Sequence, residues 1–218
     1  MLISHKHKFI IIDIPKTGTK SIRQTLIPLK VVDIIGEAKP PHLCDFSHHG
    51  SIREAAVRFK DRGWYINDYL KYSVVRNPWD RYLSFLTYYK TKLYFYRNNK
   101  PLNDNQERQE KNTIKMFHNK TDEEVLRDII ISYPAQKSYL VDSNNNMVMD
   151  SIGQLENFQD GFNRFCQLVG IPDQQLLHKN KSKCVITKKE VFAQELIDMV
   201  AEKEKWVINK FNYDFDFH

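Results

Sequence analysis

The chain has 218 residues, of which 41% are hydrophobic and 12% aromatic, which is enough for one α/β domain and short for two. Its 33 lysines and arginines exceed its 27 aspartates and glutamates, and the net charge of +6 favours anionic partners. The three cysteines, Cys44, Cys166 and Cys184, are odd in number and widely spaced, which argues against a disulfide framework. We therefore expect a single domain over residues 1–218 in a reducing compartment, the cytoplasm.

Phe9–Ile14 is the first apolar run of the chain. It is too short for the core of a signal peptide and too short to cross a membrane, so we expect neither export nor a membrane anchor. The run is rich in β-branched residues and ends at Pro15, after which Ile22, Leu26 and Leu29 recur at helical spacing. These residues predict a strand, a tight loop and a helix.

A further strand and a second helix are predicted in the next part of the chain. Val31–Ile35 is a short apolar run typical of a strand, and the residues from 36 to 49 show no clear period and read as a loop. Ser51 and Glu54 then have the spacing of a capping box, which marks the start of a helix. Gly63 supplies the stop signal for that helix.

The succession of strand and helix occurs again at Tyr72–Val75. This apolar run is followed by Asn77 and Pro78, a good N-cap and a proline suited to the first helical position, which predict a helix to about Tyr96. Repeated strand–helix units favour a sheet of parallel strands covered by helices. We therefore predict a three-layer α/β fold with a central, mainly parallel sheet of four or five strands flanked by helices, similar in plan to P-loop nucleotide kinases.

The second half of the chain is predicted to be mainly helical. Asn98–Asn112 is polar and almost without apolar residues, which indicates a mobile insertion or a lid. Further helices are predicted at Asp122–Tyr133, Phe158–Val169 and Lys188–Phe211, with a hairpin-like segment at Asn144–Leu155.

The loop between the first strand and its helix has the composition of an anion-binding site. A lysine, hydroxyl side chains and a glycine lie at the amino end of a helix, where unpaired amides and the helix dipole favour phosphate or sulfate. The loop residues are Pro15, Lys16, Thr17, Gly18, Thr19, Lys20 and Ser21. A Walker A loop is disfavoured, because Thr19 separates Gly18 from Lys20 and Ile14 stands where the first glycine would be.

The second strand–helix unit carries another pair of residues suited to an anion. Arg76 follows the strand directly, and Ser84 lies eight residues later in the predicted helix. The planar fork of arginine matches phosphate oxygens, and a serine hydroxyl adds a donor. Because ligands of parallel α/β sheets bind at the carboxyl ends of the strands, these two residues are candidates for a second phosphate.

The two motifs together resemble those of sulfotransferases that use 3′-phosphoadenosine 5′-phosphosulfate (PAPS). The string IPKTGTKSI after an apolar strand is similar to the 5′-phosphosulfate loop of the family that includes uronyl 2-O and related carbohydrate sulfotransferases and their bacterial relatives. The resemblance implies that Lys16 contacts the bridging oxygen and the 5′-phosphate, while the residues from Thr17 to Ser21 surround that phosphate. It also implies that Arg76 and Ser84 hold the 3′-phosphate.

The resemblance extends over most of the chain, including residues 151–171 and the closing FNYDFDF. In the segment HKNKS at 178–182 it suggests that Lys181 and Ser182 contact the cofactor, and a solvated basic loop is the alternative. The implied activity is transfer of a sulfuryl group to a hydroxyl of an acceptor such as a carbohydrate or another small molecule. No nucleic-acid-binding module is recognisable, so nucleic acid is not an expected partner.

Transfer to a hydroxyl requires a base close to the acceptor. His49 precedes the predicted N-cap Ser51 and resembles a histidine of the family at a similar place, so we expect it to act as the base, with His48 and Glu54 as alternatives. The nearby His42, Cys44 and Asp45 complete a cluster that matches no recognised zinc spacing, and the donor chemistry needs no metal.

Two other classes of function remain open on the residues alone. One is a P-loop-like kinase that uses ATP, which the missing second glycine disfavours. The other is a protein that binds a nucleotide or a glycan without catalysis. Which nucleotide binds, and whether it is turned over, distinguishes the three.

Overall fold

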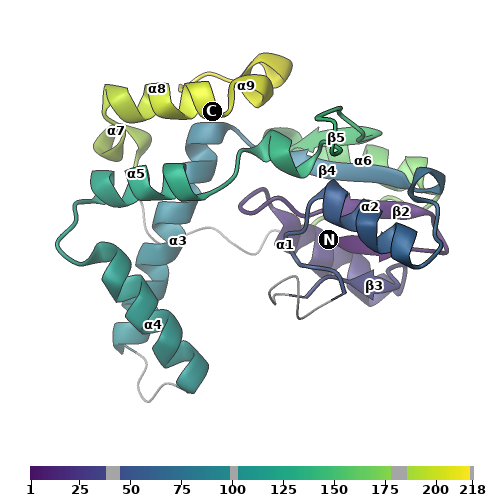
Figure 1. Cartoon of the computed structure of the whole chain (residues 1–218), viewed down its shortest axis with the longest axis horizontal. Coiled ribbons are helices and arrows are strands. Elements are labelled where there is room, and N and C mark those ends of the chain that lie inside the picture. Colours follow the sequence, from purple (N-terminus) through teal and green to yellow (C-terminus); the bar gives the residue numbers. More distant parts are fainter. Residues whose placement is uncertain (38–44, 99–102, 178–185, 217–218) are drawn as a thin grey trace. The chain divides into compact units, whose positions relative to one another are not determined.

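The computed structural model describes residues 1–37, 45–98, 103–177 and 186–216. The chain forms two compact units, each built from two separated segments (Figure 1). The first unit comprises mainly Met1–Arg76 and Ala135–Lys179, and the second comprises Asn77–Pro134 and Asn180–Phe217. The two units are described one at a time below.

The first unit contains a five-stranded sheet in the order β3-β1-β2-β4-β5. Its strands are β1 (Leu2–Ser4), β2 (Phe9–Ile12), β3 (Ile34–Ile35), β4 (Leu70–Val75) and β5 (Ser151–Gln154). β4 pairs in parallel with both β2 and β5, whereas β1 is antiparallel to both of its neighbours, β2 and β3. Four of the five strands therefore run in one direction, and the predicted α/β class with a mainly parallel sheet is confirmed.

Helices cover both faces of this sheet. Helix α2 (Ile52–Asp61) lies on one face, and α1 (Thr19–Leu26) and α6 (Phe158–Leu168) lie on the other (Figure 1). Alternate strand residues point to opposite faces, and those on the α1–α6 side form one apolar cluster with the helices. The largest members of that cluster are Phe9, Ile11, Ile22, Leu26, Tyr72, Val74, Phe158, Phe162 and Phe165. This core fixes the loop between β2 and α1 at the end of the sheet.

Two strands of the sheet differ from the prediction. β1 was not expected, because Leu2–Ser4 is too short to show a period in the sequence. The hairpin-like segment predicted at Asn144–Leu155 is only partly present: Val141 and Met147 form an isolated antiparallel bridge, but Ser151–Gln154 instead pairs in parallel with β4. The pairing partner of a short strand is set by the tertiary fold, which the local sequence does not encode.

The second unit is helical. It contains α3 (Pro78–Asn98), α4 (Asp104–Phe117), α5 (Asp122–Ser132), α7 (Lys188–Val191), α8 (Gln194–Lys203) and α9 (Lys205–Phe211). The predicted cap of α3 is confirmed, since Asn77 Oδ1 accepts from the backbone N–H groups of Trp79 and Asp80 at 3.1 and 3.3 Å. None of the helices in the described ranges is both long enough and apolar enough to span a membrane.

The prediction of one continuous helix over Lys188–Phe211 is wrong, because the region forms three short helices. Glu204 separates α8 from α9 and is 1% exposed, and its carboxylate receives a 2.9 Å hydrogen bond from the buried guanidinium of Arg81. A buried charge needs such a partner. The break coincides with this buried residue, whose φ of −106° and ψ of 14° depart from helical values.

The polar segment Asn98–Asn112 contains the start of a regular helix. α4 begins at Asp104, and Asn103 and Gln106 form a complete capping box at its amino end. Residues 99–102 lie outside the described part of the chain. The role of this segment as a mobile insertion or a lid stays a prediction.

Candidate functional site

The loop between β2 and α1 has an unusual backbone conformation. Lys16 and Gly18 both have positive φ, at 71° and 81°, and Gly18 is the N-cap residue of α1. No acidic residue occupies the first turn of α1, so no carboxylate neutralises the positive end of the helix dipole. This end of α1 is therefore suited to an anion.

The side chains of the loop divide into two groups. Thr17 is fully buried, and its hydroxyl donates to the backbone carbonyl of Ile14 at 2.9 Å, so this side chain shapes the loop. Thr19 is also buried, whereas Lys16 and Ser21 are half-buried and Lys20 is exposed. Of the predicted loop residues, Lys16, Lys20 and Ser21 have side chains that reach solvent.

Gly18 is the position where this loop meets its neighbours most closely. A Cβ atom added there would lie 2.6 Å from Leu155 Cδ1 and 2.8 Å from Phe158 Cε1. Its φ of 81° adds strain for any other residue. Only glycine fits this position without a shift of the surrounding side chains.

Arg76 lies beside the loop. It directly follows β4, the strand adjacent to β2, and its guanidinium donates to the backbone carbonyl of Lys16 at 3.4 Å. The structure therefore brings Lys16 and Arg76 together. Ser84 is half-buried on α3 and belongs to the second unit. Lys181 and Ser182, the remaining predicted contacts, lie outside the described residues.

His49 forms a hydrogen bond with Asp13, the residue that follows β2 and precedes the β2–α1 loop. Its Nδ1 is 2.8 Å from the backbone carbonyl of Asp13, an acceptor, so Nδ1 carries a proton and donates it. In the neutral ring Nε2 is then the basic nitrogen. Burial lowers the pKa of His49 below its ordinary value, although its contact with the Asp13 carbonyl works in the opposite direction. The lowered pKa favours the neutral ring, in which Nε2 is the nitrogen that can accept a proton.

His48 stacks on His49 and lies close to a buried ion pair. The two ring centroids are 4.3 Å apart and the ring planes are nearly parallel, and His48 Nε2 is 3.6 Å from Asp13 Oδ2. Asp13 is fully buried and receives a 2.7 Å hydrogen bond from Nε of Arg23. Burial, together with the charge of Arg23, lowers the pKa of His48 to about 4.

Sequence reasoning missed three residues of this region: Asp13, Arg23 and Gln136. A charged residue directly after an apolar strand is a signal that could have identified Asp13, because a buried carboxylate requires a partner. Arg23 gave no such signal, since it follows Ile22 on a helix where charged residues are ordinary. Gln136 gave none, because its partner is 60 residues away in the sequence.

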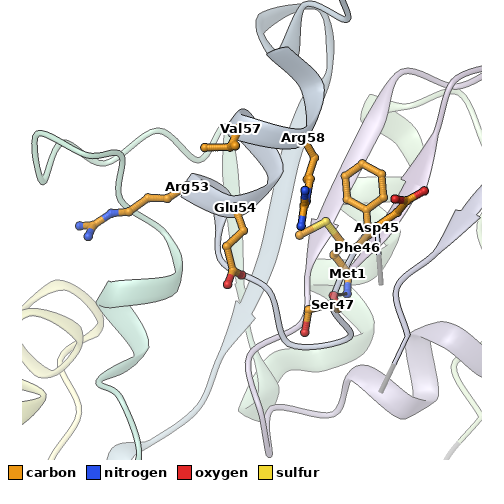
Figure 2. A pocket seen from close by; sticks show the side chains of 8 residues that line it. All are labelled: Met1, Asp45, Phe46, Ser47, Arg53, Glu54, Val57 and Arg58. Atoms are coloured by element: carbon orange, nitrogen blue, oxygen red, sulfur yellow. Dashed lines mark hydrogen bonds between the residues drawn. The ribbon is translucent and has the colours of Figure 1, made fainter. Parts of the chain in front are cut away.

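A pocket of about 330 Å³ lies beside α2 (Figure 2). Its lining residues are Met1, Asp45, Phe46, Ser47, Arg53, Glu54, Val57 and Arg58. Of the residues considered as donor contacts or as the base, only Glu54 lines it. The Glu54 carboxylate accepts from the backbone N–H of Ser51 at 2.6 Å within the confirmed capping box, which gives it a structural task.

Among residues 1–37, 45–98, 103–177 and 186–216 no group of three or more histidine, cysteine or acidic side chains is arranged for a metal ion. His42 and Cys44, which belong to the cluster seen in the sequence, lie outside those ranges.

A comparison with protein-family models gives one match, to the model described as the sulfotransferase family, over residues 1–217. Searches of curated proteins and of solved structures gave no match. The matched region contains both strand–loop–helix units, with Lys16 in the first and Arg76 in the second. Since the match covers nearly the whole chain, the chain belongs to the sulfotransferase family.

Proposed function

We propose that this sulfotransferase moves a sulfuryl group from PAPS to a hydroxyl of an acceptor, and that the acceptor is a carbohydrate or a similar small molecule. Membership in the family implies a PAPS-dependent enzyme. The observation that carries the proposal is the contact between the Arg76 guanidinium and the backbone of Lys16. It joins two candidate anion sites at the carboxyl ends of the neighbouring parallel strands β2 and β4.

The donor has two charged groups, the 5′-phosphosulfate and the 3′-phosphate, and different residues bind each of them. The amino end of α1 and the loop from Thr17 to Ser21 bind the 5′-phosphosulfate, with Lys16 beside the bridging oxygen. Arg76 and Ser84 bind the 3′-phosphate. Lys181 and Ser182 are further donor contacts on the basis of the family resemblance alone.

The proposed reaction is an in-line displacement at sulfur. The acceptor oxygen forms the new S–O bond while the bond from sulfur to the bridging oxygen breaks, and the 5′-phosphate of 3′-phosphoadenosine 5′-phosphate (PAP) leaves with the bonding electrons. Lys16 stabilises the charge that develops on that phosphate. His49 Nε2 accepts the proton of the acceptor hydroxyl, for which the hydrogen bond of Nδ1 to Asp13 prepares it.

The carbohydrate acceptor is supported by charge and by family resemblance. The net charge of +6 favours an acidic glycan over a cationic acceptor. A panel of glycans and phenols incubated with PAPS carrying radioactive sulfur identifies the class that takes up label. With the best acceptor found, Lys16→Ala should reduce turnover at least about a hundredfold. Near-normal turnover of this variant contradicts the role given to Lys16.

Binding of the donor can be tested without an acceptor. Thermal unfolding is measured with PAP, with 5′-AMP, which lacks only the 3′-phosphate, and with ATP. At a hundred times its dissociation constant, PAP should add about 2.7 kcal/mol and raise the midpoint by roughly 5 to 10 °C. Arg76→Ala should remove the preference for PAP over AMP. A shift with ATP and none with PAP would instead favour a kinase.

A further inference from the structure

Arg76 is the first residue after β4 that is not paired with a neighbouring strand. The pairing of β4 with β2 extends to Ser73, and its pairing with β5 extends to Val75. The next residue, Arg76, is paired by a side chain instead: its backbone N–H donates to Gln136 Oε1, and its backbone carbonyl accepts from Gln136 Nε2, both at 2.9 Å. Gln136 thus continues the ladder of the sheet by one residue.

The chemistry of this contact requires a primary amide. Only such a group offers one donor and one acceptor in a plane, as a peptide unit does, so it can satisfy both backbone groups of a single residue. Gln136 is 0% exposed, and it lies at the start of a short 3-10 helix, Gln136–Tyr139. The Gln136 side chain is thus withdrawn from water, whereas Arg76 itself is half-buried.

We propose that Gln136 is a positioning residue that sets recognition of the 3′-phosphate through Arg76. By holding the Arg76 backbone at both of its polar groups, Gln136 fixes the direction in which the guanidinium leaves the strand, toward the Lys16 carbonyl. A preorganised arginine loses less conformational entropy when it binds phosphate. This inference rests on the proposed role of Arg76 in binding the donor.

The test compares the affinities for PAP and 5′-AMP, measured by calorimetry on the full chain. Their ratio isolates the contribution of the 3′-phosphate, which a merely structural role of Gln136 would not change. Gln136→Met, similar in shape but without hydrogen bonds, should reduce the preference for PAP about tenfold. Gln136→Asn keeps the amide and adds no charge, but its side chain is one methylene too short to reach both backbone groups of Arg76, and it should reduce the preference as well.

Gln159 provides a matched control within the same unit. Its side-chain amide also bonds two backbone groups, donating to the carbonyl of Gln174 at 2.8 Å and accepting from the N–H of Leu176 at 2.9 Å. Gln159→Met removes a comparable pair of side-chain-to-backbone hydrogen bonds, together with the 2.6 Å bond from Gln159 Nε2 to Asn163 Oδ1, and should leave the ratio of the two affinities unchanged. Urea unfolding of both methionine variants verifies that they fold; if Gln136→Met does not, the uncharged Gln136→Asn carries the test.

The variant Arg76→Ala distinguishes an error in the proposed role of Arg76 from an error in the proposed role of Gln136. If Arg76→Ala leaves the preference for PAP intact, the proposed role of Arg76 is wrong. If Arg76→Ala abolishes the preference while both Gln136 variants retain it in full, only the role of Gln136 is wrong. Combining Gln136→Met with Arg76→Ala should cause no further loss of preference, because Gln136 acts through Arg76. A further loss in the double variant contradicts the inference.

Discussion

His48 shows how burial can outweigh a nearby opposite charge. Its Nε2 lies 3.6 Å from the carboxylate of Asp13, a contact that by itself favours the protonated ring. Burial, followed by the positive charge of Arg23, acts in the other direction, and the pKa of His48 falls to about 4. His48 is therefore neutral near pH 7, and it presents no fixed positive charge to His49.

This shift predicts how stability depends on pH. The unfolded chain binds a proton on His48 near pH 6.5, whereas the folded chain does so only near pH 4, so His48 contributes stability at neutral pH that is lost as the pH falls through this window. The greatest slope from one such proton is about 1.4 kcal/mol per pH unit. Urea unfolding of the wild type and of His48→Gln at pH 7.5, 6 and 5 measures it.

The replacement should flatten the dependence between pH 6.5 and 4 by a measurable part of that slope. Carboxylates that titrate in the same range affect both proteins alike, so the difference between them isolates His48. An identical pH dependence in the two proteins would show that His48 titrates normally in the folded state.

The residues that could be predicted from the sequence are those placed by local structure. Lys16 and Arg76 each follow an apolar strand and precede a helix, and that position alone brings them to one end of a parallel sheet. Gln136 acts on Arg76 across 60 residues, and Asp13 bonds His49 across 36. No local pattern reports such contacts, so only the structure reveals which groups position the predicted ones.

At the scale of elements, the β2–loop–α1 unit depends on one glycine. Gly18 combines a positive φ with close approach to Leu155 and Phe158, and it lies at the amino end of the helix that would bind the donor. Gly170 also has positive φ, at 67°, but a Cβ there would meet nothing within 4 Å. A substitution at Gly170 therefore measures backbone strain alone, whereas a substitution at Gly18 measures backbone strain and steric crowding together.

Gly18→Ala and Gly170→Ala should consequently differ in cost. Gly170→Ala should lower the free energy of unfolding by about 1 kcal/mol, the cost of the left-handed backbone. Gly18→Ala should lower it by a further 1 to 3 kcal/mol or so, because Leu155 and Phe158 must move, and should weaken binding of PAP. Urea unfolding and calorimetry measure both; equal losses of stability would mean that the side chains around Gly18 yield freely.

The helices illustrate where local signals suffice and where they fail. The capping box of Ser51 and Glu54 places the start of α2 correctly, because both of its hydrogen bonds form within four residues. The break between α8 and α9 lies at Glu204, whose partner Arg81 is 123 residues away in the sequence. A helical period that continues through Glu204 gives no indication of that ion pair.

At the scale of the whole molecule, the two units are interleaved along the chain. The first unit is completed only when β5 pairs with β4, yet the segment between these strands contains α3, α4 and α5 of the second unit. Joining the ends of a loop costs more entropy as its flexible length grows. Folding of the helices shortens that length and should favour the pairing of β4 with β5.

This coupling predicts that the two units unfold together, and the tryptophans allow the test. The chain has three tryptophans, of which Trp64 lies in the first unit and Trp79 and Trp206 lie in the second. In Trp64→Phe, tryptophan fluorescence reports the second unit alone, whereas far-ultraviolet circular dichroism reports the whole chain. Coincident urea transitions by the two probes are expected for a cooperative domain. Separate midpoints would instead show that the units are independent domains, because neither the sheet nor the helices would then require the other to fold.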